Sequence, residues 1–284
     1  NEASRLFFVV QPPLLLLRRG VREFYVGSPL IDCYFWDSFG QWATGCNALL
    51  WSLRSMENNQ FDTIAPSYRQ SILPWMKITG ESLEFYARCR VQWTSRKTKA
   101  QGIRPKRIMD FGCGVGEAIP FLREEFGDST EIIGVDVSKN SLELAASKYA
   151  SDRVTFEYLD HNSPKQNLDL VYCNGVFHHL HGSERDVAAK YVRDCLRPDG
   201  YFALWENNPW NPLMRYNMSH AEIDRDAEPI SATSGRKIVT RNGFDLISTE
   251  HLFIFPALLG FLRPLESLAR SIPIGAQYVL FSRK

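Results

Sequence analysis

The sequence predicts an α/β fold in which helices cover both faces of a largely parallel sheet. From residue 107 onward, short apolar runs alternate with helical segments, which is the rhythm of β-α-β units. A glycine-rich turn follows the first run, and acidic or amide residues follow later ones. Ligands of such sheets bind at the carboxyl ends of the strands. The composition fits a folded chain, since 44% of the 284 residues are hydrophobic and 13% are aromatic.

The expected elements follow one another in order along this part of the chain. Each strand is a short apolar run, and each ends at a glycine, an acid, an amide or a turn. Ser138 has the position of an N-cap, and Ser183 opens a segment with the pattern of a capping box, Ser-Glu-Arg-Asp. The expected strands are 107–111, 131–136, 154–159, 168–173 and 201–205, and the expected helices are 117–126, the one after Ser138, and the one from 183 to 196.

A glycine-rich loop, Asp110-Phe-Gly112-Cys-Gly114-Val-Gly116-Glu117, follows the first strand. Glycine lets the backbone turn tightly and lets a ligand approach without interference from Cβ. The spacing is GxGxG, and Glu117 stands where a dinucleotide fingerprint requires its third glycine. A carboxylate there would face the pyrophosphate of a dinucleotide. The loop therefore favours a ligand without phosphates over a nicotinamide cofactor.

Polar residues at the ends of the other strands complete a candidate nucleoside site. Asp136 ends the second strand, where a carboxylate either accepts hydrogen bonds from both ribose hydroxyls or caps the next helix. Asp160 follows the third strand and could accept from an exocyclic amine, although a plain loop aspartate is the simpler interpretation. Asn174 ends the fourth strand. Asp110 lies inside an apolar strand, where a buried carboxylate needs the loop amides or a ligand ammonium as partner.

Together these residues describe a pocket for an adenosine with a zwitterionic, positively charged tail. With the segments Ile133-Gly-Val-Asp136, 168–180 and 196–202, they make residues 57–284 resemble the class I S-adenosylmethionine-dependent methyltransferases. The resemblance implies S-adenosyl-L-methionine as cofactor. It also implies a Rossmann-like three-layer sandwich, with a seven-stranded, mostly parallel sheet and a C-terminal antiparallel hairpin formed by 243–255 and 275–282.

The resemblance assigns roles by position. The loop glycines would lie under the amino-acid tail of the cofactor, Asp136 would hold the ribose, Asp160 the adenine edge, and Asn174 would approach the tail or sulfonium. The expected cofactor-binding residues are therefore Asp110, Gly112, Gly114, Gly116, Asp136, Asp160 and Asn174.

A finer resemblance concerns Glu206-Asn-Asn-Pro-Trp-Asn-Pro212, after the fifth strand. It is similar to the Glu-His-Asn-Pro-x-Asn-Pro signature of a methyltransferase subgroup of small-molecule type. Asn207 replaces the signature histidine, so any role of that histidine does not carry over. The likeness names no substrate.

Methyl transfer needs an acceptor lone pair about 3 Å from the methyl group, in line with the C–S bond and away from water. An acidic acceptor also benefits from a general base. His178, His179 and Glu206 are the candidates, because they lie just past strand ends. In the alternative interpretation the histidines pack at the start of a helix and Glu206 binds backbone amides. Nothing has the ligand spacing of a metal site, so no metal is expected.

The expected acceptor is an apolar small molecule that binds between residues 207–230 and the apolar segment 255–273. Alternatively, segment 255–273 packs in the core or contacts a membrane surface. The alternatives are an RNA or protein methyltransferase that uses the basic segment 88–107, or a noncatalytic relative that binds S-adenosylmethionine. Nucleic acid is not expected, because 33 basic and 32 acidic residues balance and no Asn/Asp-Pro-Pro-aromatic motif follows strand four.

Residues 1–55 differ from the rest, since they are rich in aromatic residues and show no sustained helical or strand period. We expect a methyltransferase domain at 56–284 and an N-terminal extension at 1–55, with a cap over the sheet as the alternative. No run reaches the roughly 18 to 20 apolar residues of a membrane span. The six cysteines form no CxxC motif or disulfide framework, which favours reduced thiols and a cytoplasmic protein.

Overall fold

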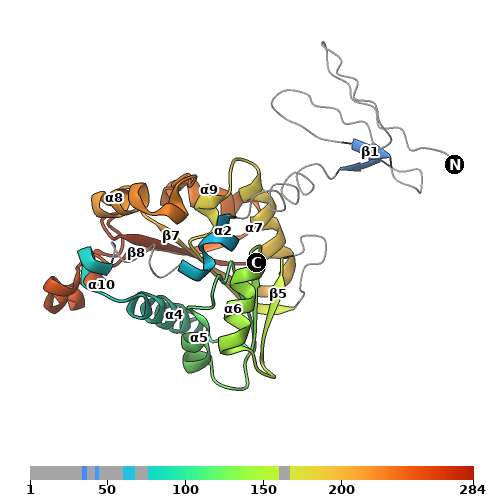
Figure 1. The fold of residues 1–284 in the computed structure, drawn as a ribbon, viewed down its shortest axis with the longest axis horizontal. Coiled ribbons are helices and arrows are strands. Elements are labelled where there is room, and N and C mark those ends of the chain that lie inside the picture. Colours follow the sequence, from blue (N-terminus) through green and yellow to red (C-terminus); the bar gives the residue numbers. More distant parts are fainter. Residues whose placement is uncertain (1–33, 37–41, 45–59, 68–75, 160–166) are drawn as a thin grey trace, which may run out of the picture. The chain divides into compact units, whose positions relative to one another are not determined.

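The computed structural model describes residues 34–36, 42–44, 60–67, 76–159 and 167–284 (Figure 1). By its internal contacts the chain divides into two units, Asn1–Asn58 and Asn59–Lys284. In the first unit, β1 (Tyr34–Trp36) and β2 (Trp42–Thr44) pair antiparallel. The second unit holds the α/β fold. That 1–55 is an extension separate from the functional domain stays a prediction.

A seven-stranded sheet with the order β5-β4-β3-β6-β7-β9-β8 forms the centre of the second unit. Strands β3 to β7 pair in parallel, and β9 runs antiparallel to both of its neighbours, β7 and β8. The mostly parallel sheet with a C-terminal antiparallel pair is therefore confirmed. The strands are β3 (Arg107–Phe111), β4 (Glu131–Asp136), β5 (Val154–Tyr158), β6 (Leu168–Asn174), β7 (Leu196–Asn207), β8 (Asp245–Leu252) and β9 (Gln277–Arg283).

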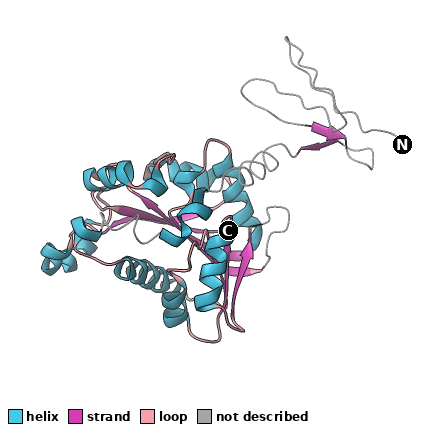
Figure 2. Cartoon of the chain, viewed as in Figure 1, coloured by secondary structure: helices cyan, strands magenta, loops and turns pink. Residues whose placement is uncertain are grey.

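Helices cover both faces of this sheet, which makes three layers (Figures 1 and 2). Helices α4, α5 and α6 lie on one side, and α7 and α9 lie on the other (Figure 1). The α-helices are α2 (Gln60–Ile64), α4 (Leu83–Ala100), α5 (Ile119–Phe126), α6 (Lys139–Tyr149), α7 (Glu184–Cys195), α8 (Pro212–His220), α9 (Ala232–Arg241) and α10 (Glu266–Ala269). Short 3-10 helices are η1 (Ala65–Ser67), η2 (Phe177–His179), η3 (Glu222–Asp224) and η4 (Ala257–Leu265).

The two predicted helix caps have different outcomes. The Ser138 hydroxyl accepts a hydrogen bond from the Ser141 amide at 3.1 Å, so this N-cap of α6 is confirmed. The capping box at Ser183 is wrong, because Ser183 has helical dihedrals and its side chain forms no capping bond. The chain turns two residues earlier, where the Glu184 carboxylate accepts from the His181 amide at 2.7 Å.

Helix α4 packs against the sheet through two buried tryptophans. The rings of Trp93 on α4 and Trp205 on β7 meet edge to face with centroids 5.2 Å apart, and Phe281 on β9 lies 6.0 Å from Trp93. The Trp93 indole also donates to Glu250 at 2.9 Å, and the Trp205 indole donates to Thr94 at 3.3 Å. Both polar ends are thus satisfied, so the apolar surface of these rings is buried without leaving an unpaired donor.

The segment between β8 and β9 leaves large apolar side chains in solvent. Leu258, Phe261 and Leu268 are 88%, 76% and 81% exposed, so the interpretation of these residues as core contacts is wrong. No helix in the described ranges combines the length and the apolar character that crossing a bilayer requires.

We expect Trp93→Ala to lower the free energy of unfolding by about 3–5 kcal/mol, because it removes a buried ring and leaves a cavity between α4 and the sheet. Urea denaturation followed by circular dichroism measures this loss. Trp210→Ala is the matched control, since Trp210 is 71% exposed, and its effect should stay within about 0.5 kcal/mol. Equal effects of the two substitutions would contradict the assigned core.

Candidate functional site

The glycine loop between β3 and α5 has the backbone that its sequence requires. Gly112, Gly114 and Gly116 have φ angles of 73°, 50° and 81°, in the left-handed region that favours glycine. A Cβ on Gly112 would lie 2.2 Å from Val176, and a Cβ on Gly116 would lie 2.8 Å from the ring of Tyr149. A Cβ on Gly114 would meet nothing within 4 Å. The loop therefore packs tightly at both ends and is open to a ligand at its centre.

Asp136, at the end of β4, holds this loop in place. Its Oδ2 accepts a hydrogen bond from the Gly114 amide at 2.8 Å, and its Oδ1 accepts from the Ser138 amide at 2.9 Å. Burial raises the pKa of Asp136, and the amides of Ser138 and Gly114 oppose that rise. The amide of Val137 is a third backbone donor to this carboxylate. A carboxylate has about four lone-pair sites, so about one remains for a ribose hydroxyl.

Asp110 is buried below the loop, with 3% of its surface exposed. The amides of Gly112 and Cys113 donate to the Val135 carbonyl at 2.8 and 3.0 Å, so the expectation that loop amides partner Asp110 is wrong for these two. Burial, followed by the charge of Asp136, raises the pKa of Asp110 to about 7, and Arg90 opposes this rise. A cationic ligand group beside Asp110 would stabilise its charged form.

Asn174 and Asp160 complete the list of expected cofactor residues. Asp160 lies outside the described residues, so its predicted role has no geometry to compare. Asn174 ends β6 and borders a cavity of 140 Å³ at the carboxyl ends of β6 and β7. Its Oδ1 is buried and accepts no hydrogen bond within the described part of the chain. An unpaired buried acceptor is costly, so a ligand donor at this position would stabilise the site.

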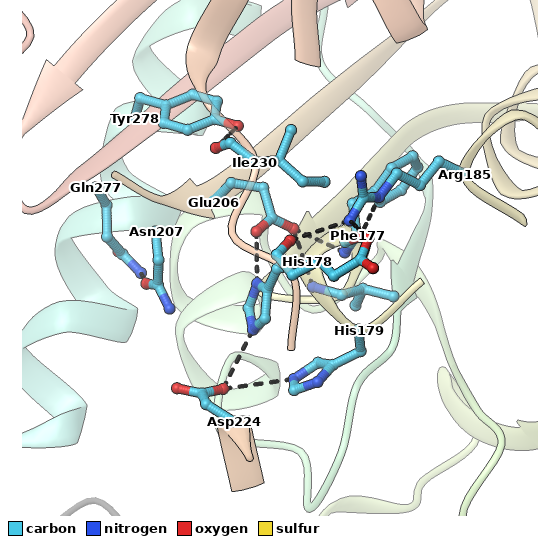
Figure 3. Close-up of polar contacts among 12 residues, drawn as sticks. Phe177, His178, His179, Arg185, Glu206, Asn207, Asp224, Ile230, Gln277 and Tyr278 are labelled. Atoms are coloured by element: carbon cyan, nitrogen blue, oxygen red, sulfur yellow. Dashed lines mark hydrogen bonds and ion pairs between the residues drawn. The ribbon is translucent and has the colours of Figure 1, made fainter. Parts of the chain in front are cut away.

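The three candidate bases meet in a buried cluster with Asp224 of η3 (Figure 3). Glu206 accepts from the amides of Val176 and Phe177 at 3.1 and 2.7 Å, and its other oxygen lies 2.6 Å from Nδ1 of His178. Asp224 Oδ1 lies 3.3 Å from Nε2 of His178 and 3.7 Å from Nε2 of His179. Glu206 thus holds the turn after β6, and Asp224 connects both imidazoles.

The pKa values of the two histidines shift in opposite directions. Burial lowers the pKa of His178, but the carboxylates of Glu206 and Asp224 outweigh it and raise the pKa to about 10. Burial and the charge of His178 lower the pKa of His179 to about 2. In this arrangement His178 is an imidazolium between two carboxylates, which cannot accept a proton. His179 is the neutral imidazole, and its Nδ1 is buried without a partner among the described residues.

The asparagines that follow Glu206 hold two loops together. Asn208 is fully buried, and its amide group donates to the carbonyls of Pro273 and Gly275 at 3.0 and 2.8 Å. Asn211 caps α8 by accepting from the Met214 amide at 2.9 Å. Asn207, which replaces the signature histidine, accepts from Gln277 at 3.0 Å. The motif therefore orders the wall of the cavity, a role that sequence reasoning missed.

Helix α2 contributes two further residues that sequence reasoning missed. Asp62 accepts from the Ser138 hydroxyl at 2.6 Å and from the Asn140 amide at 3.0 Å, at the start of α6. The Phe61 ring lies edge to face with His179, with centroids 5.1 Å apart. Helix α2 thus joins the start of α6 to the histidine cluster. A five-residue helix next to a polar stretch gives no periodic signal from which to predict this contact.

A second cavity of 230 Å³ adjoins the first, and Tyr86, Phe253 and Ala276 line both. Its walls are largely apolar and include Phe85, Leu213, Leu252 and Pro256, whereas Arg96, Arg263, Glu266 and Arg270 supply its charges. The paired cavities therefore offer a polar chamber at the strand ends and an apolar chamber beside it.

Comparisons with known proteins show which proteins this chain resembles. A family model described as a methyltransferase domain matches residues 109–202. A putative methyltransferase of Geobacillus sp. (strain WCH70) is 31% identical over 116 residues, which cover 38% of this chain and 45% of that protein. Trans-aconitate 2-methyltransferase of Rhodopseudomonas palustris (strain BisB5) is 26% identical over 142 residues, which cover 45% of this chain and 54% of that protein. The chain thus spans about half the length of these curated relatives.

Known structures share the fold. A TehB-like S-adenosylmethionine-dependent methyltransferase of Corynebacterium glutamicum aligns with a TM-score of 0.51 at 15% identity, over 78% of this chain and 98% of that one. A chain in the complex of the Haloferax volcanii Trm112 methyltransferase activator with a putative methyltransferase aligns with a TM-score of 0.54 at 17% identity, over 80% of this chain and 98% of that one.

The buried Asp110 should make the free energy of unfolding fall as the pH rises. Its folded pKa of about 7 exceeds the value of about 3.9 in an unfolded chain. Between these values the folded state binds the extra proton, so this contribution to stability falls as pH rises from about 4 to about 7 and then levels off. Asp110→Asn should lose this component, measured as the difference between urea stabilities at pH 5 and pH 8. Identical pH profiles of variant and wild type would contradict the assignment.

Proposed function

We propose that this chain, a member of the class I S-adenosylmethionine-dependent methyltransferases, transfers the methyl group of the cofactor to a small, largely apolar acceptor. The observation that carries the proposal is the hydrogen bond between Asp136 and Gly114, which ties a strand-end carboxylate to the open centre of the glycine loop. A nucleoside with a charged but phosphate-free tail suits this combination. Trans-aconitate is the acceptor named for one relative, which favours small molecules as acceptors.

S-adenosylmethionine fits the residues at the loop. The space beside Gly114 would take the amino-acid tail, and Asp136 would accept from a ribose hydroxyl through its remaining lone-pair site. Asn174 has an unpaired oxygen that would accept from the tail ammonium or lie near the sulfonium. The bound cofactor supplies a methyl group on a positively charged sulfur. The negative charge of Asp110 below the loop would favour such a cation.

The acceptor would occupy the paired cavities at the ends of β6 and β7. Its nucleophilic atom would lie in the polar chamber lined by Asn174 and His179, and its apolar body would lie against Phe85 and Phe253. In the transfer, a bond forms between this atom and the methyl carbon, and the C–S bond electrons pass to sulfur, which leaves a neutral thioether. The acceptor proton leaves to a base or to water.

Glu206 and His178 act, in this proposal, as positioning residues. Both oxygens of Glu206 and both nitrogens of His178 already have partners in the cluster. His179 remains the candidate that touches the acceptor, because it lines the cavity and its Nδ1 has no partner among the described residues.

The basic segment 88–107 gives little support to a nucleic-acid substrate. Four of its cations form ion pairs with acids of neighbouring elements: Arg88 with Glu124 at 2.5 Å, Lys97 with Glu250, Lys99 with Glu125 at 3.7 Å, and Arg107 with Glu131 at 3.2 Å. These cations are therefore partly neutralised within the fold and attract phosphates less strongly.

Incubating the chain with cofactor labelled in its methyl group and a fractionated cell extract tests the proposed reaction. We expect label in small organic molecules that partition into an apolar solvent. Label in RNA or protein would overturn the proposed acceptor class. Cofactor binding without any transfer would point to a noncatalytic relative.

Asp136→Ala should weaken binding of S-adenosylmethionine by about 1–3 kcal/mol, because it removes the acceptor for the ribose hydroxyls and loosens the loop. Isothermal titration calorimetry measures the change. Asp152→Ala, at an exposed turn, is the control and should bind as the wild type does. An unchanged affinity of Asp136→Ala would remove this residue from the cofactor site.

His179→Ala should slow methyl transfer while leaving the affinity for S-adenosylmethionine nearly unchanged, since His179 faces the acceptor chamber. Single-turnover transfer to an active extract fraction gives the rate, and calorimetry gives the affinity. Parallel losses of rate and affinity would instead favour a packing role for His179.

A further inference from the structure

The cluster of His178, His179 and Asp224 has the composition of a metal site. One potential ligand atom from each residue lies within 4.8 Å of the other two. Two imidazoles and one carboxylate form a ligand set that proteins use for Zn²⁺ and related divalent metals. Asp224 lies far along the chain from the two histidines, which is why ligand spacing in the sequence gave no indication of this group.

The separations of the ligand atoms fit a common metal ion. Bonds of about 2.0–2.1 Å in a tetrahedral site place neighbouring ligand atoms roughly 3.3 Å apart. Asp224 Oδ1 lies 3.3 Å from Nε2 of His178 and 3.7 Å from Nε2 of His179. Small side-chain rotations would therefore bring all three atoms to one centre. The metal would displace the proton on Nε2 of His178, which would leave to solvent, because a ligating imidazole nitrogen must be deprotonated.

A second carboxylate orients the first of these ligands. Glu206 lies 2.6 Å from Nδ1 of His178, so Nε2 is directed toward Asp224 (Figure 3). Metal-binding histidines commonly donate their other ring N–H to a carboxylate, which fixes the tautomer and the ring orientation. The amides of Val176 and Phe177 in turn fix Glu206. The hydrogen bonds that would orient His178 as a metal ligand are therefore already present.

The cluster also borders open space. His178, His179 and Asp224 all line the 140 Å³ cavity, as does Asn174 with its unpaired buried oxygen. A metal held by three protein atoms on one side would keep a coordination position facing this cavity. Catalytic zinc sites share this feature, with three protein ligands and one exchangeable position.

We propose that His178, His179 and Asp224 bind a divalent transition-metal ion, with Zn²⁺ as the expected occupant. The ion would hold an oxygen of the acceptor in the cavity and favour its deprotonated form. This role rests on the proposed methyltransferase function, whereas the binding site itself does not.

Titration of the full chain with Co²⁺ after removal of metals by chelation tests the site. Co²⁺ reports a protein site of low coordination number through visible absorption, and Zn²⁺ should displace it. We expect saturation at one Co²⁺ per chain. Asp224→Asn and His179→Gln should each weaken binding at least tenfold. His220→Asn is the control, because His220 is an exposed histidine near Asp224 in sequence, and it should bind as the wild type does.

Absence of saturable binding by a folded wild-type chain would overturn the proposal, and so would equal affinities of all variants. Circular dichroism of each variant separates loss of a ligand from loss of the fold. Calorimetry with S-adenosylmethionine on the metal-free chain separates the two hypotheses. Cofactor binding without Co²⁺ binding refutes the metal site alone, whereas Co²⁺ binding without cofactor binding refutes the proposed function alone.

Discussion

The hydrogen bond from the Gly114 amide to the Asp136 carboxylate is the constraint on which the candidate cofactor site depends. It joins the turn after β3 to the end of β4, two neighbouring parallel strands. The second Asp136 oxygen fixes the start of α6 through Ser138, and Asp62 of α2 reaches the same point. A buried carboxylate is tolerated here because backbone amides replace its water. The carboxylate that shapes the loop would thus also be the acceptor for the ribose of a bound nucleoside.

Glu206 plays the corresponding part on the acceptor side. Its carboxylate is fully buried and binds the turn after β6 through two amides and His178. Asn208 then ties the chain after β7 to the loop before β9. In both halves of the site, an acid at a strand end thus binds the neighbouring loop. A ligand would bind to the hydrogen-bonding groups that remain unpaired. Such fixed dipoles need little rearrangement when charge changes during a reaction.

The fold was predictable from the sequence because apolar runs, glycines and strand-end acids recur at regular spacing, and Ser138 marked its helix correctly. The Ser183 capping box failed because the chain turns first at His181, where the Glu184 carboxylate accepts the amide. The cluster around His178 was beyond prediction for another reason. Asp224 and Phe61 reach it from distant segments, and neither carries a local pattern. Burial lowers the pKa of both histidines, but the carboxylates of Glu206 and Asp224 raise that of His178 overall. Two adjacent histidines in a sequence cannot reveal this distinction.

We propose that a nucleoside sulfonium lies across the glycine loop and the ends of β4 and β6. Hydrogen–deuterium exchange of the full chain with and without S-adenosylmethionine locates the cofactor directly. We expect slower exchange in residues 112–118, 136–140 and 174–178, with α9 unchanged. Protection elsewhere, or no protection at saturating cofactor, would contradict it.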